Sequence, residues 1–227
     1  PAFSFRPLAL SGRDSGVAGG GQTASRHGPR GDSKSLPSPD LALWPCGPMT
    51  MARLPLWPGR KPADPARSEE SDRARVIAAH GIEAVEDDPE LVQIVEFAAQ
   101  LCGVPVALVT VVEEQRQRFL ARAGFAERET PRSTSFCGHA MFEAAPLVVP
   151  DATKDPRFAE NPLVTGEPGI RFYAGAPLVS SEGTPLGALC AIDFEPRPEG
   201  LSELQLQGLS VLAEAVMRRL TFERQAR

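Results

Sequence analysis

A run of seven residues in the middle of the chain, Val106 to Val112, constrains the fold more than any other feature. Its sequence, VALVTVV, is rich in β-branched residues and is apolar at both odd and even positions. A strand with one face in water alternates apolar and polar residues instead. The run therefore predicts a strand in the interior of a sheet that other parts of the chain cover on both faces.

The first 70 residues are not expected to form the layers that cover this sheet. They contain 11 of the 23 prolines and 9 of the 20 glycines, without a periodic apolar pattern. Such a segment buries too little apolar surface to offset its ordering entropy. We predict a disordered tail over residues 1–70, whose removal leaves the melting temperature unchanged, and one folded domain over residues 71–227. Because the sequence begins with Pro1, we expect a fragment, or a true start at Met49 or Met51.

The predicted domain mixes helices with closely spaced strands. Asp88 and Pro89 are typical of a helix N-cap and first turn, and apolar residues at helical spacing follow as far as Gly103. Three more helices are predicted: one over 73–80, a short one capped by Thr134 or Ser135, and a last one that begins with the capping box Ser202 to Gln205. The predicted strands cover residues 116–121, 147–149, 172–179 and 186–192. A loop is predicted between Gly124 and Pro131. Hairpins at this spacing predict an antiparallel sheet with helices packed against it.

Charge divides the chain at the same place. Residues 1–70 carry nine Lys/Arg and six Asp/Glu, a net charge of +3, whereas residues 71–227 carry a net charge of −8. An acidic domain is a poor partner for nucleic-acid phosphates or an anionic membrane surface. No stretch approaches the roughly 20 apolar residues that span a bilayer, and no secretory leader is visible. We therefore expect a cytoplasmic protein with neither nucleic acid nor membrane as a partner.

The four cysteines, Cys46, Cys102, Cys137 and Cys190, lie far apart and form no CxxC pair. This spacing argues against a disulfide framework and against a structural zinc site. A metal site built from Cys137, His139 and Asp151 is a minor alternative.

Several longer motifs carry a resemblance to a known family. They are RETPR at 128–132, SFCGHA at 135–140, PLVVPDA at 146–152, DPRF at 155–158, NPLV at 161–164, IRFYAGAPL at 170–178 and GALCAID at 187–193. The series closely resembles the bacterial GAF domains that precede histidine kinases and diguanylate cyclases or occur alone, and it covers about residues 73–222.

The resemblance implies an α+β fold with a central antiparallel sheet of five or six strands. The first and last helices should lie together on one face, and loops and short helices should cover a ligand cavity on the other. The implied role is a small-molecule- or redox-sensing regulatory module in bacterial signal transduction, not an enzyme. We further expect a homodimer through the terminal helices, no output domain in this chain, and a signalling partner in trans.

Twelve residues are candidates for contact with a ligand: Phe119, Phe136, Cys137, His139, Asp151, Arg157, Phe158, Asn161, Arg171, Tyr173, Cys190 and Asp193. Several of the polar ones belong to an irregular connection over 151–169, long enough to form part of a binding site. Each has a structural alternative. The phenylalanines would line a core, and the Asp and Asn side chains would hydrogen-bond to the loop's own backbone. Arg171 would pair with Asp151 or Asp193, and this is the interpretation that we favour for Arg171.

Cys137 is the sharpest chemical feature. A thiol near a helix N-terminus has a lowered pKa, but apolar neighbours raise it, and we expect burial to prevail and the thiol to react slowly. His139 lies two residues further along the helix and therefore points to another side. A Cys–His pair is not expected.

Two other functions stay open at this point. One is a ligand-free dimerisation and transmission module, which a space filled by side chains would favour over a cavity lined by Arg171, Tyr173, Asp151 and Cys190. The other is an enzyme similar to the thiol-dependent free methionine sulfoxide reductases, which share the GAF fold but need several converging cysteines. No cofactor is identified: residues 162–170 lack the Cys and His of bilin-binding relatives, and no motif marks a cyclic-nucleotide site.

Overall fold

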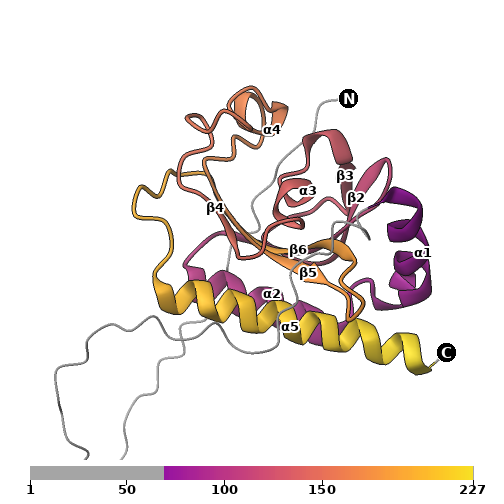
Figure 1. The fold of residues 1–227 in the computed structure, drawn as a ribbon. Coiled ribbons are helices and arrows are strands. Elements are labelled where there is room, and N and C mark those ends of the chain that lie inside the picture. Colours follow the sequence, from indigo (N-terminus) through magenta and orange to yellow (C-terminus); the bar gives the residue numbers. More distant parts are fainter. Residues whose placement is uncertain (1–68, 227) are drawn as a thin grey trace, which may run out of the picture. The chain divides into compact units, whose positions relative to one another are not determined.

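The computed structural model describes the backbone of residues 69–226 and the side chains of residues 69–222. The predictions made for residues 1–68 lie outside this part of the chain. Within it, six strands form one sheet in the order β3-β2-β1-β6-β5-β4, and every pair of neighbours is antiparallel (Figure 1). The strands are β1 Val106–Val112, β2 Arg116–Ala123, β3 Glu129–Pro131, β4 Leu147–Val149, β5 Phe172–Val179 and β6 Pro185–Asp193.

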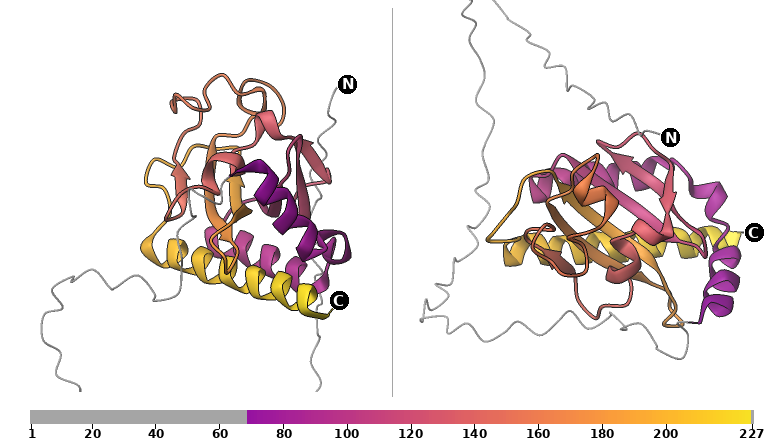
Figure 2. Two further views of the ribbon diagram at one scale, coloured as in Figure 1. Left: turned by 45° about the vertical axis from the view of Figure 1, so that its right-hand side comes forward. Right: turned by 90° about the horizontal axis from the view of Figure 1, so that it is seen from above.

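The helices lie on both sides of this sheet. They are α1 Glu70–His80, α2 Pro89–Cys102, α3 Cys137–Ala140, α4 Pro162–Thr165 and α5 Glu203–Ala226, with 3-10 turns η2 Ile82–Val85 and η3 Arg132–Thr134. α2 and α5 run side by side under one face, and α3 and α4 lie over the other (Figures 1 and 2). This confirms the predicted α+β fold with a central antiparallel sheet.

The strand β1 is the apolar run Val106–Val112, and its position in the sheet explains why both of its faces are apolar. It pairs with β2 on one side and with β6 on the other, and all seven of its residues are buried. Ala107, Val109 and Val111 face the core under α2 and α5, whereas Val106 and Leu108 face a second core under α3 and α4. Both faces of the strand are therefore apolar because the sheet separates two cores.

The two long helices begin as their sequences predict. The Asp88 carboxylate accepts hydrogen bonds from the backbone N–H groups of Glu90 and Leu91. At α5, Ser202 Oγ accepts from Gln205 N–H, and Gln205 Oε1 accepts from Ser202 N–H in return, which completes the capping box. Both caps satisfy backbone donors that a helix start would otherwise leave unpaired.

The first and last helices, which the resemblance placed together on one face, contact each other: α1 packs against α5 at one end of the domain, and α2 runs alongside α5 (Figure 2). One local feature differs from the sequence predictions. The loop predicted between Gly124 and Pro131 contains the strand β3, whose Thr130 pairs with Gln117 of β2. A three-residue strand that ends in proline shows no alternation, so periodicity could not reveal it.

None of the helices in residues 69–226 combines the length and the apolar character needed to cross a membrane.

Candidate functional site

Two thiols and a phenol meet in the core beneath α3. The Tyr173 hydroxyl donates a hydrogen bond to Cys137 Sγ over 3.2 Å, and both side chains are buried. Gly175 makes this contact possible, because a Cβ at that position would stand 2.7 Å from Tyr173 Cζ. The tyrosine ring therefore lies across the glycine and carries its hydroxyl to the cysteine.

Cys190 belongs to the same group. It stands directly opposite Gly175 in the β5–β6 pairing and opposite Leu108 in the β1–β6 pairing, and its side chain is fully buried in the second core. The Cys190 thiol hydrogen-bonds to the Cys137 sulfur, whereas the Thr110 hydroxyl donates to the Ala188 carbonyl. Cys137 thus has two side-chain donors, Tyr173 on β5 and Cys190 on β6.

These donors bear on one expectation from the sequence. Burial raises the pKa of Cys137, but its hydrogen bonds, the one from Cys190 first, outweigh burial, and the pKa lies below the ordinary value of a thiol. The pKa of Cys190 is raised well above that value by its hydrogen bond to Cys137 and by burial. The pKa of Cys137 thus moves in the direction opposite to the expectation that burial would prevail, because the donors come from strands that are distant in sequence.

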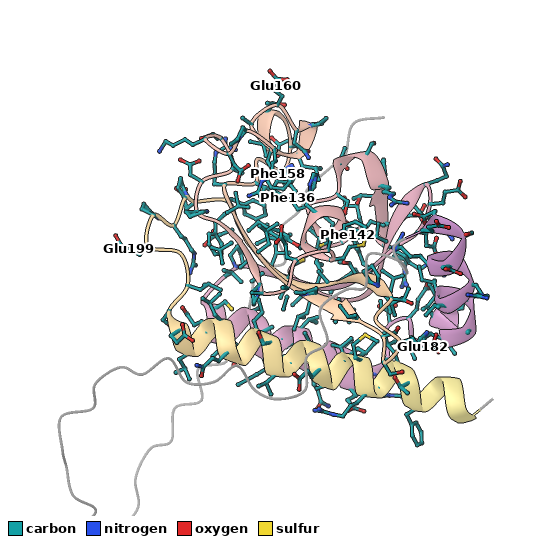
Figure 3. All side chains as sticks on the ribbon, in the orientation of Figure 1. Phe136, Phe142, Phe158, Glu160, Glu182 and Glu199 are labelled. Atoms are coloured by element: carbon teal, nitrogen blue, oxygen red, sulfur yellow. The ribbon has the colours of Figure 1, made fainter. Side chains whose placement is uncertain are left out.

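Aromatic side chains cover Cys137, Tyr173 and Cys190 on the side that faces the loops. Phe136 stacks on Phe158 with ring centroids 4.1 Å apart, and Figure 3 shows the two rings side by side between the sheet and α4. Tyr173 packs against Phe136 at 5.2 Å, and the His139 ring meets the edge of Phe158 at 5.0 Å. His139 therefore contacts an aromatic ring and not the thiol two residues before it.

The polar candidates in the loop serve the loop itself. Asp151 accepts from Thr153 and forms an ion pair with Lys154 at 2.8 Å, and these contacts lower its pKa to about 2. Arg157 is held by Asp155 at 2.6 Å. Asn161 caps α4 by accepting from Leu163 N–H and donates to the Thr134 carbonyl. The structural interpretation of these residues is the one that their hydrogen bonds support.

The expected pairing of Arg171 with an aspartate was wrong. Arg171 donates to the backbone carbonyls of Val164 and Ile170, and Asp193 forms its ion pair with Arg197 at 2.7 Å. Arg171 still holds the loop down, but it does so through α4. A side chain cannot be assigned to a carboxylate from sequence when backbone carbonyls compete for it.

A small cavity of about 110 Å³ lies elsewhere, at the rim between β3 and α4. We call it the rim pocket; it is lined by Phe125, Glu127, Thr130, Pro131, Thr134, Pro162, Leu163 and Glu167. Glu127 Oε2 is buried and has no hydrogen-bond partner among the described residues. Of the predicted site residues, Phe119 contacts the lining residue Phe125 edge-on at 5.5 Å, and Asn161 hydrogen-bonds to the lining residues Leu163 and Thr134. No sequence pattern indicated the rim pocket, because its walls come from two separate segments, residues 125–134 and 162–167.

The described residues include no group of three or more His, Cys, Asp or Glu side chains placed to hold a metal ion. Cys137, His139 and Asp151 are therefore not brought together as ligands. Cys137 turns into the core, and Asp151 is held by Thr153 and Lys154.

A six-stranded antiparallel sheet with long helices on one face, and short helices and loops on the other, defines a class of sensory domain. The family model of the GAF domain matches residues 89–220, and the chain belongs to this family. GAF domains are regulatory sensing modules.

Comparison with known proteins gives relatives within that class. A cyclic di-GMP phosphodiesterase of Pseudomonas aeruginosa is 42% identical over 156 residues, which are 69% of this chain and 26% of that protein. The chain thus spans about a quarter of the length of this relative. Among solved structures, the chromophore-binding domain of a bacteriophytochrome from R. palustris aligns with a TM-score of 0.51 and 12% identity, covering 70% of this chain and 65% of that one. The GAF domain of an Acinetobacter phosphoenolpyruvate-protein phosphotransferase aligns with a TM-score of 0.49 and 19% identity, covering 69% and 96%.

Proposed function

We propose that this chain is a small-molecule-sensing regulatory module of bacterial signal transduction, and that it is not itself an enzyme. The observation that carries the proposal is the rim pocket, whose wall includes Glu127, a residue with one buried carboxylate oxygen that has no partner among the described residues. A buried polar atom without a partner costs free energy. A ligand that supplies the missing donor recovers that free energy on binding.

The chemistry of the rim pocket favours a small organic cation. Glu127 and Glu167 provide carboxylates, Thr130 and Thr134 provide hydroxyls, and the remaining walls are phenylalanine, leucine and proline. An ammonium group would donate to Glu127 while its carbon substituents contact the apolar walls. A cyclic nucleotide fits poorly, because its phosphate would meet like charge in a cavity of about 110 Å³.

The rim pocket is connected to the helix layer through the sheet. Thr130 pairs with Gln117 of β2, and β2 packs against α2, which lies beside α5. Because the matching relative is a cyclic di-GMP phosphodiesterase, we propose that the signal received here adjusts the turnover of cyclic di-GMP by an output domain, either in the same protein or in a partner.

A ligand-free transmission module is the second candidate, and a separate observation favours it. The space in which Tyr173 and Cys190 lie is filled by side chains, since both are fully buried and Phe136 and Phe158 stack above them. Binding at the rim pocket is the property that separates the two candidates. The reductase alternative has less support, because Cys102 lies in the other core, under α2 and α5.

A binding panel tests the proposal. Methylammonium, ethanolamine and choline are added to the protein, with acetate and cyclic di-GMP as anionic comparisons, and binding is followed by calorimetry and thermal shift. We expect at least one cation to raise the melting temperature and the anions to leave it unchanged. Glu127→Gln should abolish the cation effect.

The matched control is Glu129→Gln. Glu129 is exposed and pairs with Arg116, and it does not line the rim pocket, so this variant should respond to cations as the unmodified protein does. Equal cation responses in the unmodified protein and in Glu127→Gln, or no response in either, would contradict the proposal and favour the transmission module.

A further inference from the structure

We propose that Cys137 and Cys190 form a redox-active dithiol that closes to an intramolecular disulfide when a peroxide oxidises it. The site is separate from the rim pocket, and the inference does not depend on the ligand proposed there. It would give the module a second input, the oxidation state of its own core.

The first support is the placement of the two thiols. Cys190 faces Gly175 across the β5–β6 pairing, where directly opposed Cβ positions lie roughly 4.5–5.5 Å apart. The Tyr173 hydroxyl lies against the place that a Gly175 Cβ would occupy, and it is 3.2 Å from Cys137 Sγ. Both thiols therefore meet above Gly175, and α3, which begins at Cys137, packs directly on β6.

The second support is that the two sulfurs have different roles in their hydrogen bonds. Cys137 accepts hydrogen bonds from Cys190 and Tyr173, which stabilise its thiolate and lower its pKa against the effect of burial. Cys190 keeps its proton, because its hydrogen bond to Cys137 and its burial raise its pKa. The geometry makes Cys137 the sulfur that attacks the oxidant and Cys190 the sulfur that resolves the product.

The reaction proceeds in two balanced steps. The Cys137 thiolate attacks one oxygen of hydrogen peroxide, the O–O bond breaks, and the departing hydroxide takes up the thiol proton as water, which leaves Cys137 as a sulfenic acid. The Cys190 sulfur then attacks the Cys137 sulfur, the S–O bond breaks, and hydroxide leaves with the Cys190 proton as a second water. Two thiols lose two electrons in total, and one peroxide is reduced to two waters.

Burial sets the rate and the consequence of this reaction. Cys137 is 2% exposed and Cys190 is 0% exposed, so the oxidant reaches them when the short α3 and the adjoining loops open locally. Once formed, the disulfide links α3 covalently to the inner strand β6. Oxidation would therefore fix the loop-covered face to the sheet and oppose its opening.

Peptide mass spectrometry of the full chain after treatment with hydrogen peroxide tests this proposal directly. We expect a Cys137–Cys190 cross-linked peptide whose mass is lower by two hydrogens and which a phosphine reductant cleaves. Cys190→Ser should instead leave a Cys137 sulfenic acid that dimedone traps. Tyr173→Phe should slow the formation of the disulfide by roughly tenfold, because one donor to the thiolate is lost.

Two controls separate this site from the rest of the molecule. Cys102→Ser and Glu127→Gln should both give the same yield of the cross-link as the unmodified protein, the second because the rim pocket plays no part. Since the cross-link is mapped in the unmodified chain, the test does not rely on any variant that fails to fold. Oxidation of Cys137 to a sulfinic acid without cross-linking, or cross-links that involve Cys46 or Cys102 in place of this pair, would overturn the proposal.

Discussion

At the scale of single residues, the absence of one methyl group decides where the Tyr173 hydroxyl can stand. A Cβ at Gly175 would lie 2.7 Å from Tyr173 Cζ and 2.9 Å from Cε1, well inside van der Waals contact. The ring is fully buried, and Phe136 packs against it. It therefore has little room to move aside.

We expect Gly175→Ala to lower the free energy of unfolding by roughly 1–3 kcal/mol, because overpacking a filled core forces strained side chains. It should also remove the hydrogen bond from Tyr173 to Cys137. Urea unfolding measures the first effect and the alkylation rate of Cys137 the second. Gly138→Ala is the matched control, since a Cβ there meets only Ser135, at 3.4 Å and 3.5 Å. If both variants are equally stable, the packing argument fails.

The thiol of Cys102 makes stability depend on pH at the alkaline end. Burial raises its pKa to about 11, although the Arg197 guanidinium acts in the opposite direction. The unfolded chain releases this proton near pH 8.5. A raised pKa in the folded state gives a contribution to stability that is complete below about pH 8.5 and is lost as the pH rises towards 11.

We therefore expect the free energy of unfolding to fall by about 3 kcal/mol less in Cys102→Ala than in the unmodified protein between pH 8 and pH 11. Urea unfolding at several pH values provides the measurement. The other titrating groups are shared by both proteins, so the difference between the two curves isolates Cys102. Parallel curves would show that this thiol is not desolvated in the folded state.

At the scale of elements, α1 is attached to the sheet through one buried arginine. Arg73 is fully buried and donates to the backbone carbonyls of Pro185 and Val112, which lie at the ends of β6 and β1. Its guanidinium also pairs with Glu70 at 2.9 Å, and Glu70 pairs with Arg132 at 2.6 Å. Burial lowers the pKa of Arg73, and the charge of Glu70 acts against that shift.

Replacing this arginine should release the helix. We expect Arg73→Leu to lower the free energy of unfolding by about 3 kcal/mol, because Glu70 and two strand-end carbonyls lose their donor. Hydrogen exchange over residues 70–80 should rise at the same time. Arg75→Leu is the control: that side chain is 73% exposed and pairs with Asp72, so its loss should cost less than about 0.5 kcal/mol. Equal effects of the two variants would rule out the anchoring role.

At the scale of the whole molecule, the outer surface of α5 carries the features expected of a contact between two copies. Leu204, Val211 and Phe222 are 72%, 55% and 65% exposed, and their spacings of 7 and 11 residues place them on one side of the helix. Val216, by contrast, is fully buried on the inner side of the helix. A charge at Val216 would therefore test folding and not association.

We predict that the chain is a homodimer and that Val211→Glu with Phe222→Glu converts it to a monomer whose melting temperature is unchanged at low concentration. Sedimentation measures the mass. Phe142→Glu is the control, since Phe142 is 45% exposed on the other side of the sheet, after α3. The prediction fails if the double variant sediments like the unmodified protein, or if Phe142→Glu dissociates it equally.

Most strands of the sheet and the starts of the long helices could be predicted from local sequence signals. Strand periodicity, the caps at Asp88 and Ser202, and the hairpin turn before β6 are local signals, because they depend on residues within a few positions of each other. They predicted β1, β5 and α2 closely, since each follows a long, regular pattern. The strand β3 was not predicted, because three residues are too few to show a periodic pattern.

The candidate site could not be predicted in the same way, because it depends on tertiary contacts. Arg171 binds backbone carbonyls in place of an aspartate, the pKa of Cys137 depends on donors on β5 and β6, and the rim pocket joins residues 125–134 to residues 162–167. Hydrogen bonds and cavities depend on where side chains end in space, and a sequence specifies that only through the whole fold. Local backbone preferences act over a few residues, whereas a site is made by residues that only the packed sheet brings together.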